Sequence, residues 1–260
     1  VDSFEVTNGE LTLTETQVLS PEKPITGAGS AVVEVSSNSS TDFTSILALD
    51  NGANETVKFT ADSTFTGNFD NSTIEVVNNA TLTTSVAKVD TLTSTGAGDI
   101  VLTGDSTTAD LSNITNNITI NGNVELQDSR VSQGDITVDG ALTILDATDI
   151  SGKTIDGTGS LELQGGGVVD LANVSVDTLT GNFDSATTLD NLNIDIDASS
   201  STGDITVNAN NSVSNVTTGS GNDTINTEDG SINITANGGT DTVVYTAATT
   251  LTGTLTGVEN

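Results

Sequence analysis

Apolar residues alternate with polar ones along most of the chain, in short runs that turn residues interrupt. Examples are the runs 31–35, 118–120, 161–163, 194–196 and 232–234. A period of two places the apolar side chains on one face of a β-strand. Gly, Asn and Asp separate the runs, as at Asn121-Gly122 and Asp229-Gly230. No segment has a helical period, so the sequence predicts an all-β protein.

The high net charge raises the question of whether such a chain folds. Thirty-six acidic and five basic residues give a formal charge of −31, and a high charge is typical of disordered chains. Leu, Ile, Val and Phe nevertheless make up roughly a quarter of the residues, which is above the level associated with disorder. Because these residues also recur in patterned runs, we expect the chain to fold.

Repeated segments within the sequence indicate how the strands are arranged. The phrase at 65–70 returns at 179–184, and the phrase at 89–93 returns at 176–180. Gly-Asp-Ile begins at Gly98 and again at Gly134, an interval that equals two coils of about 18 residues each. Repeats that cannot bury their own apolar face are typical of solenoids. The sequence predicts a parallel β-solenoid, a β-helix or β-roll of roughly 18–23-residue coils; tandem β-sandwich domains are the alternative.

The two prolines suggest a division of the chain. Pro21 and Pro24 lie close together, and proline is excluded from the interior of a β-ladder. We therefore expect an N-terminal strand pair or cap with a proline-bounded connection over 1–24, a solenoid body over 25–216, and a distinct end over 217–260. The chain starts with Val rather than Met, which suggests a piece of a longer precursor.

The residues that are missing exclude several kinds of function. Without His or Cys the chain has no imidazole or thiolate metal ligand and no Ser-His-Asp or Cys-His nucleophile. Five basic residues cannot form the stripe that nucleic acid or an anionic membrane surface requires. No apolar run is long enough to insert into a membrane. Paired acids such as Asp195 and Asp197 resemble the two carboxylates of a glycosidase, but 36 acids produce such pairs by chance. We expect no enzyme.

Threonine-rich strands raise one further possibility, an ordered ice-binding face. Thr-x-Thr triplets occur at Thr81, Thr91 and Thr178, among other places. Such a face needs one triplet per coil, and the intervals between the triplets are irregular. The strand propensity of threonine explains them better.

One motif carries recognisable chemistry. Residues 218–226 follow the nonapeptide G-G-x-G-x-D-x-U-x except at the first position, where Thr218 replaces glycine. Residues 236–244 repeat it in the same register, so Gly239 and Asp241 align with Gly221 and Asp223. The nonapeptide between them has Ile232 in place of the aspartate. The interval between the two repeats is one full coil, so Asp223 and Asp241 should lie above one another.

This arrangement suits calcium. Glycines such as Gly219, Gly221 and Gly239 would permit a tight turn with positive φ, whose backbone carbonyls point inward. The carboxylates of Asp223 and Asp241 would then share Ca²⁺ through oxygen ligands alone. The alternative is plain turn chemistry, in which each aspartate bonds its own backbone.

On these residues the chain resembles the calcium-binding RTX family of secreted bacterial toxins, adhesins, hydrolases and surface-layer (S-layer) proteins. The resemblance covers about residues 217–260 and departs from the family pattern at Thr218, Ala236 and Ile232. The threonine-rich composition without cysteine also resembles such surface-layer proteins. The resemblance implies secretion to the surface of a bacterial or archaeal cell.

Together these features predict a structural protein that assembles with copies of itself into a lattice, sheath or filament, with calcium ordering the coils. Strand edges or solenoid ends would meet neighbouring copies. The alternative is a segment of a large RTX adhesin that binds a host or a cell-surface glycan.

Overall fold

The structure is a computed structural model that describes residues 3–19, 22–49, 55–69, 71–127 and 129–258. Backbone contacts divide the chain into two compact units. The first unit is Val1–Gly122 with Ser132–Asp135, and the second is Asn123–Val131 with Ile136–Asn260. The expected division at residues 24 and 216 stays a prediction, and Pro21 lies outside the described residues.

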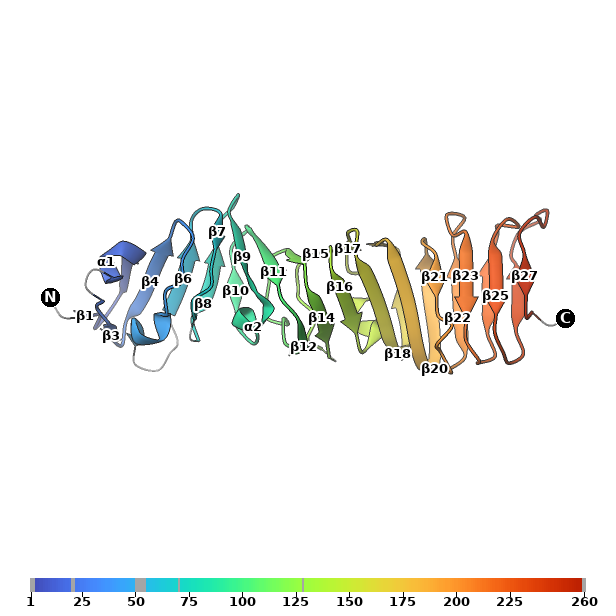
Figure 1. Ribbon diagram of the computed structural model, residues 1–260, viewed down its shortest axis with the longest axis horizontal. Helices are drawn as coiled ribbons and strands as arrows, with labels where there is room; N and C mark the ends of the chain where they lie inside the picture. Colours follow the sequence, from blue (N-terminus) through green and yellow to red (C-terminus); the bar gives the residue numbers. More distant parts are fainter. Residues whose placement is uncertain (1–2, 20–21, 50–54, 70, 128, 259–260) are drawn as a thin grey trace. The chain divides into compact units, whose positions relative to one another are not determined.

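Both units are parallel β-solenoids, which confirms the predicted fold class. Strands make up 49% of the chain and helices 6%, in about 14 turns with a coil spacing of about 18 residues. The named strands pair in parallel, as a solenoid requires and as a tandem β-sandwich does not. Figure 1 shows successive strands stacked side by side within each unit.

In its described residues, the first unit contains strands β1 to β13, two short α-helices and one 3-10 helix. The strands are β1 (Phe4–Glu5), β2 (Glu10–Thr14), β3 (Ile25–Gly27), β4 (Ser30–Val35), β5 (Leu47–Leu49), β6 (Glu55–Phe59), β7 (Ser63–Thr64), β8 (Thr73–Val76), β9 (Thr81–Ser85), β10 (Ser94–Thr95), β11 (Asp99–Thr103), β12 (Ser106–Ala109) and β13 (Ile118–Ile120). The helices are α1 (Glu15–Leu19), α2 (Val86–Val89) and η1 (Phe43–Ser45).

Coil length varies in the first unit. Val33 pairs with Val57 on the next coil, whereas Val57 pairs with Ile74 after a much shorter stretch of chain. Four buried phenylalanines fill the interior of this part of the unit, namely Phe43, Phe59, Phe65 and Phe69. The rings of Phe65 and Phe69 stack with their centroids 4.2 Å apart. Large rings therefore occupy a part of the unit where successive coils differ in length.

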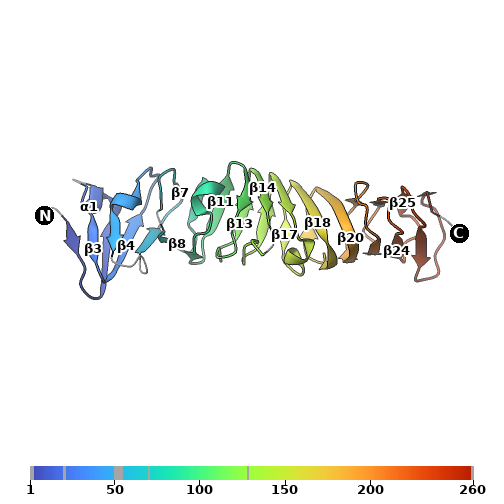
Figure 2. The ribbon, with the colours of Figure 1, turned by 90° about the horizontal axis from the view of Figure 1, so that it is seen from below.

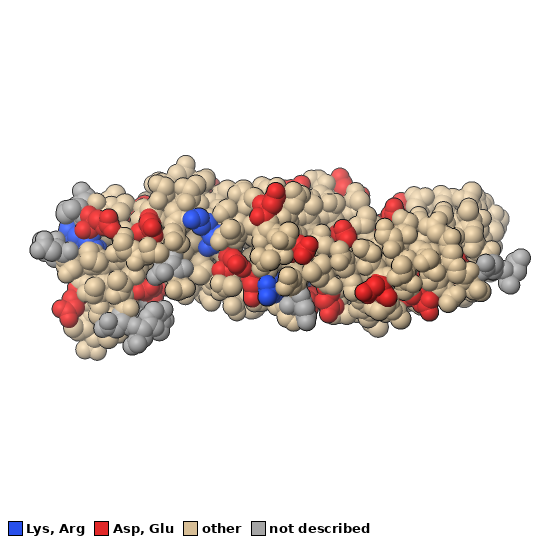
Figure 3. Space-filling model, turned by 60° about the horizontal axis from the view of Figure 1, so that its bottom comes forward, with Lys and Arg blue, Asp and Glu red and all other residues tan. Residues whose placement is uncertain are grey.

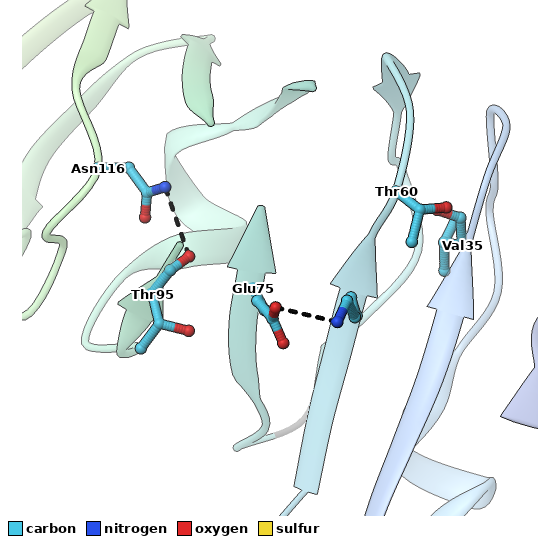
Figure 4. A network of polar contacts seen from close by, with 6 residues as sticks. Val35, Thr60, Glu75, Thr95 and Asn116 are labelled. Carbon is cyan, nitrogen blue, oxygen red and sulfur yellow. Dashed lines mark hydrogen bonds and ion pairs between the residues drawn. The ribbon is translucent and has the colours of Figure 1, made fainter. Parts of the chain in front are cut away.

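Outward-facing side chains form matched rows on the first unit. Lys58 on β6 lies in register between Glu34 on β4 and Glu75 on β8. Its Nζ is 3.1 Å from Oε1 of Glu75, the ion pair drawn in Figure 4. The same view shows buried Asn116, whose Nδ2 donates to the carbonyl oxygen of Thr95 at 3.4 Å. Its stronger bond, at 2.7 Å, goes to the carbonyl oxygen of Gly98.

The described part of the second unit contains strands β14 to β27 and one 3-10 helix, η2 (Ala147–Ile150). The strands are β14 (Asn123–Leu126), β15 (Ile136–Val138), β16 (Ala141–Ile144), β17 (Ile155–Asp156), β18 (Ser160–Asp170), β19 (Val174–Ser175), β20 (Thr178–Leu192), β21 (Ile196–Asp197), β22 (Ile205–Ala209), β23 (Asn215–Thr218), β24 (Thr224–Thr227), β25 (Asn233–Ala236), β26 (Thr242–Tyr245) and β27 (Leu255–Thr256).

Two long strands organise the second unit. Strands β18 and β20 pair along most of their length, with a register shift between Gly165 and Gly167. The first half of β20 pairs with β21, and the ladder goes on through β23, β25 and β27. The second half of β20 pairs with β22, and that ladder goes on through β24 and β26. Figure 2 shows these later coils from below. Their interior is a column of aliphatic side chains, in which Leu189, Val207 and Ile225 succeed one another in register on neighbouring coils and are buried.

The outer surface is acidic, as the composition requires. Figure 3 shows acidic side chains scattered among neutral ones on the face in view, with few basic ones between them. In the second unit, Glu125, Glu162 and Asp197 belong to one outward row in which Thr143 and Thr180 alternate with them. The alternation keeps like charges from lying directly opposite on neighbouring strands. No helix among the described residues is long and apolar enough to cross a membrane.

Candidate metal centre

The two nonapeptide aspartates lie on neighbouring coils of the second unit. Asp223 directly precedes β24 and Asp241 directly precedes β26, and these strands pair with Thr224 opposite Thr242. The predicted stacking of Asp223 on Asp241 is therefore confirmed. Both residues are buried, with 1% of each exposed. Ile225, the apolar position of the first nonapeptide, is fully buried, and Val243 of the second is half-buried.

Each aspartate receives a backbone hydrogen bond from the preceding coil. The amide of Ile205 donates to Oδ1 of Asp223 at 2.8 Å. The amide of Asp223 donates in turn to Oδ1 of Asp241, also at 2.8 Å. At this corner a side-chain oxygen thus takes the role that a strand carbonyl has elsewhere in the ladder. The carboxylates therefore hold successive coils in register.

The glycines are needed for a different reason from the one expected. Gly239 has a φ of +110°, as predicted, but Gly219 and Gly221 are not among the residues with positive φ. A Cβ at Gly219 would lie 1.9 Å from the carbonyl oxygen of Ser201, and one at Gly221 would lie 2.3 Å from that of Gly203. Glycine permits this close approach because it has no side chain. The expectation of positive φ was wrong at Gly219 and Gly221.

Some buried oxygens at this corner have no hydrogen-bond partner among the residues that the structure describes. They are Oδ2 of Asp223 and Oγ1 of Thr218, the residue that replaces the first glycine of the motif. Leaving a buried carboxylate oxygen without a partner is costly, and a cation removes that cost. Carboxylate and hydroxyl oxygens are ligands that Ca²⁺ accepts. In donor chemistry, the residues present fit calcium.

The same corner lacks a dense acidic cage. Among the described residues, no three His, Cys, Asp or Glu side chains are grouped closely enough to hold a metal ion. A calcium ion here would need backbone carbonyls and water to reach the six to eight oxygens that it takes. The nonapeptide between the two repeats has no carboxylate at the motif's aspartate position, because that position is Ile232, which is fully buried in the core.

Local turn chemistry does occur nearby, and it differs from the pattern at Asp223. Oδ1 of Asp229 accepts hydrogen bonds from the backbone and the hydroxyl of Ser231, two residues further on. These bonds lower the pKa of Asp229 below its usual value. The bonds to Asp223 and Asp241 span 18 residues instead. Asp229 thus shows the local turn bonding that we gave as the alternative to calcium. The hydrogen bonds named above for Asp223 and Asp241 come instead from the neighbouring coil.

The structure also shows side-chain ladders that the sequence reasoning missed. In the first, which we call the groove ladder, Asn226 Nδ2 donates to Asn208 Oδ1 and Asn208 Nδ2 donates to Asp190 Oδ1. In the second, the closed ladder, Asn233 donates to Asn215 and Asn215 donates to Asp195. An aspartate starts each ladder because a carboxylate accepts but does not donate. The signal in the sequence was Asp or Asn recurring once per coil.

The paired acids Asp195 and Asp197 are both engaged in structural bonds. Asp195 accepts from the side chain and backbone of Asn215 and from the backbone of Ser214. Burial raises the pKa of Asp195, but these hydrogen bonds outweigh it and hold the pKa below the ordinary value. Oδ1 of Asp197 accepts from the backbone of Ser199. The geometry therefore gives both carboxylates a part in holding coils and turns.

Comparison of the chain with protein-family models, with curated proteins and with solved structures finds no significant match. What the structure establishes is a parallel β-solenoid compatible with a β-roll.

Proposed function

We propose that this chain is a structural, self-assembling extracellular protein of the RTX-related surface-layer kind, folded or assembled with calcium. The observation that carries the proposal is the buried carboxylate of Asp223 at the nonapeptide corner, whose Oδ2 has no hydrogen-bond partner in the described part of the chain. Calcium bound there would neutralise a carboxylate that the fold has already removed from water. It would also join two successive coils through Asp223 and Asp241.

The charge of the surface supports a second role for calcium. A net charge of −31 makes two copies repel one another, most strongly at low ionic strength. The outward row with Glu125, Glu162 and Asp197 would repel the same row on a second copy. A divalent cation screens such faces and lets copies approach side by side. Assembly into a lattice, sheath or filament on a bacterial or archaeal surface would then depend on calcium.

A calcium titration tests this proposal. The protein is followed by circular dichroism and light scattering from excess chelator upward, and the endpoint is imaged by negative-stain electron microscopy. We expect β-structure or particle size to rise with calcium and ordered arrays to form. A protein that is fully folded in chelator and stays monomeric in calcium contradicts the proposal.

Matched variants locate the effect. The double variant Asp223→Ala, Asp241→Ala should abolish the calcium response. The double variant Asp177→Ala, Asp184→Ala removes the same charge from exposed positions of the same unit and should retain the response. Saturable binding of a host glycan by a calcium-insensitive monomer would instead favour the adhesin alternative.

A further inference from the structure

A polar groove opens where the groove ladder meets the turns that follow β20, β22 and β24. Its volume is about 360 Å³, and its lining includes Asp190, Asn208, Asn210, Asn226, Glu228 and Thr246. A register shift between Leu189 and Leu192 shapes one wall, where Asn191 adopts a φ of +56°. Asparagine tolerates this left-handed conformation better than most residues. The groove therefore repeats one turn position over successive coils.

The groove ladder ends in an unused acceptor. Position 244, the next in register after Asn226, is a valine that cannot donate a hydrogen bond. Oδ1 of Asn226 consequently accepts no hydrogen bond within the described chain. The carboxylate of exposed Glu228 accepts none from the described residues either. The closed ladder differs at this point, because the backbone and hydroxyl of Thr254 both donate to Oδ1 of Asn233. The last acceptor of the closed ladder is therefore satisfied, whereas the last acceptor of the groove ladder faces the groove without a donor from the described chain.

The lining defines the chemistry of a ligand. Asn226 Oδ1 and the carboxylates of Asp190 and Glu228 call for hydrogen-bond donors, while the amide groups on the same wall supply donors of their own. Two carboxylates without a basic neighbour in the lining reject anions. The lining contains no aromatic residue for a flat ring to stack on. A neutral polyhydroxyl compound meets all three conditions, since each hydroxyl both donates and accepts.

The spacing of the coils selects the shape of that compound. Neighbouring strands lie roughly 4.8 Å apart, about the length of one sugar ring in a linear chain. Asn208 and Asn226 are in register on adjacent strands and repeat at this spacing. We propose that this groove binds a neutral linear polysaccharide that runs across the coils with one sugar per coil. The inference does not depend on the calcium site or on self-assembly.

Titration with short saccharides tests the inference. The intact chain is titrated with cellotriose, maltotriose and chitotriose, and with trigalacturonate as the acidic counterpart, by saturation-transfer NMR and calorimetry. We expect saturable binding of at least one neutral trisaccharide with a dissociation constant on the order of 1 mM, as suits an open, hydrated groove. Trigalacturonate should not bind. Absence of binding by all three neutral compounds, or equal binding of trigalacturonate, overturns the inference.

Three variants separate the groove from the rest of the surface. Asn226→Ala removes the open acceptor and should weaken binding about tenfold. Glu228→Gln keeps the shape but removes a charge, so it should retain the neutral ligand and begin to admit trigalacturonate. Asn233→Ala is the control, because it removes the equivalent rung of the closed ladder and should leave binding unchanged.

Circular dichroism confirms that each variant is folded. Equal loss of binding in Asn226→Ala and Asn233→Ala overturns the assignment to this groove. Saccharide binding is measured in a buffer in which circular dichroism shows the chain to be folded, so its failure leaves the calcium-dependent assembly untouched, and the failure of assembly leaves this inference untouched.

Discussion

The backbone amide of Asp223 donates a hydrogen bond to the buried Oδ1 of Asp241, 18 residues further along the chain and one coil away. The same Asp223 accepts the amide of Ile205 from the coil before. One residue thus joins three successive coils, through its backbone on one side and its side chain on the other.

Removing the acceptor at position 241 should destabilise the second unit. In Asp241→Ala the buried amide of Asp223 loses its partner, which should lower the free energy of unfolding by about 1–3 kcal/mol. Asp241→Asn should cost less, because an amide oxygen can still accept. Urea unfolding in chelator measures both variants, with the exposed Asp177→Ala as control. Equal stability of the alanine variant and the wild type would show that this bond is dispensable.

The glycine at position 221 should not tolerate a methyl group. Gly221→Ala would place a Cβ 2.3 Å from the carbonyl oxygen of Gly203, so neighbouring coils would have to separate. We expect a loss of about 1–3 kcal/mol, as in other overpacked sites. Gly238→Ala is the matched control, since its nearest atoms are 3.9 Å away and its φ is not positive. Thermal or urea unfolding compares the two; equal loss in both would contradict the close-approach argument.

Acid should weaken the closed ladder. The hydrogen bonds from Asn215 and Ser214 hold the folded-state pKa of Asp195 below its ordinary value of 3.8. A group with a depressed pKa stabilises the fold above its unfolded-state pKa, and this contribution is lost as the pH falls through the folded-state value. Stability should therefore decline below about pH 4. In Asn215→Ala this part of the decline should shrink, which urea unfolding at pH 7 and pH 3 measures. An unchanged pH dependence in the variant would contradict this account.

The buried aliphatic side chains of the second unit should contribute most to its stability. Leu161 is fully buried between Leu142 and Leu179 of the adjacent coils. Leu161→Ala should lower the free energy of unfolding by about 2–5 kcal/mol. The half-buried Thr143, in the neighbouring outward row, provides the control. If Thr143→Ala proves as damaging as Leu161→Ala, the core does not lie where the structure places it.

The sequence predicted the fold class because alternation fixes which face of a strand is buried. Leu161 and Leu163 were expected on an inner face, and both are fully buried. Alternation does not fix which strand comes next to which. The coil that leads from Val33 to its partner Val57 is longer than the expected range, because insertions in a turn leave no mark on the strands.

The threonine residues also show that a sequence pattern does not reveal which strands lie side by side. Counting Thr-x-Thr triplets indicated no regular face, yet Thr188, Thr206, Thr224 and Thr242 lie in register on four successive strands. These four threonines are not part of triplets, because the residue two positions further on is Asp, Asn or Val rather than Thr. A count of triplets therefore could not reveal a row of single threonines. Regular register, rather than a repeated motif, produces the row.

The candidate site was predictable only where its spacing was visible. Asp223 and Asp241 were identified because the interval between them matched two repeats of a known nonapeptide, which make one full coil. The role of their Oδ1 atoms as acceptors for the preceding coil was not predictable, since it depends on burial. The groove at Asn226 was missed because its open acceptor results from a valine at position 244, which carries no polar signal.

One side of the later coils repeats at a constant interval, which has a consequence for how such a chain changes over generations. From Leu189 to Val243 the inner residues meet at one fixed interval, and the bonds from Ile205 to Asp223 and from Asp223 to Asp241 repeat at the same interval. Duplication or loss of the coding sequence for one such interval would therefore add or remove one layer on this side and leave the layers next to it with partners of the same type. The opposite side, where Ile196, Val216, Ile234 and Leu255 pair at unequal intervals, would have to absorb the change in its turns.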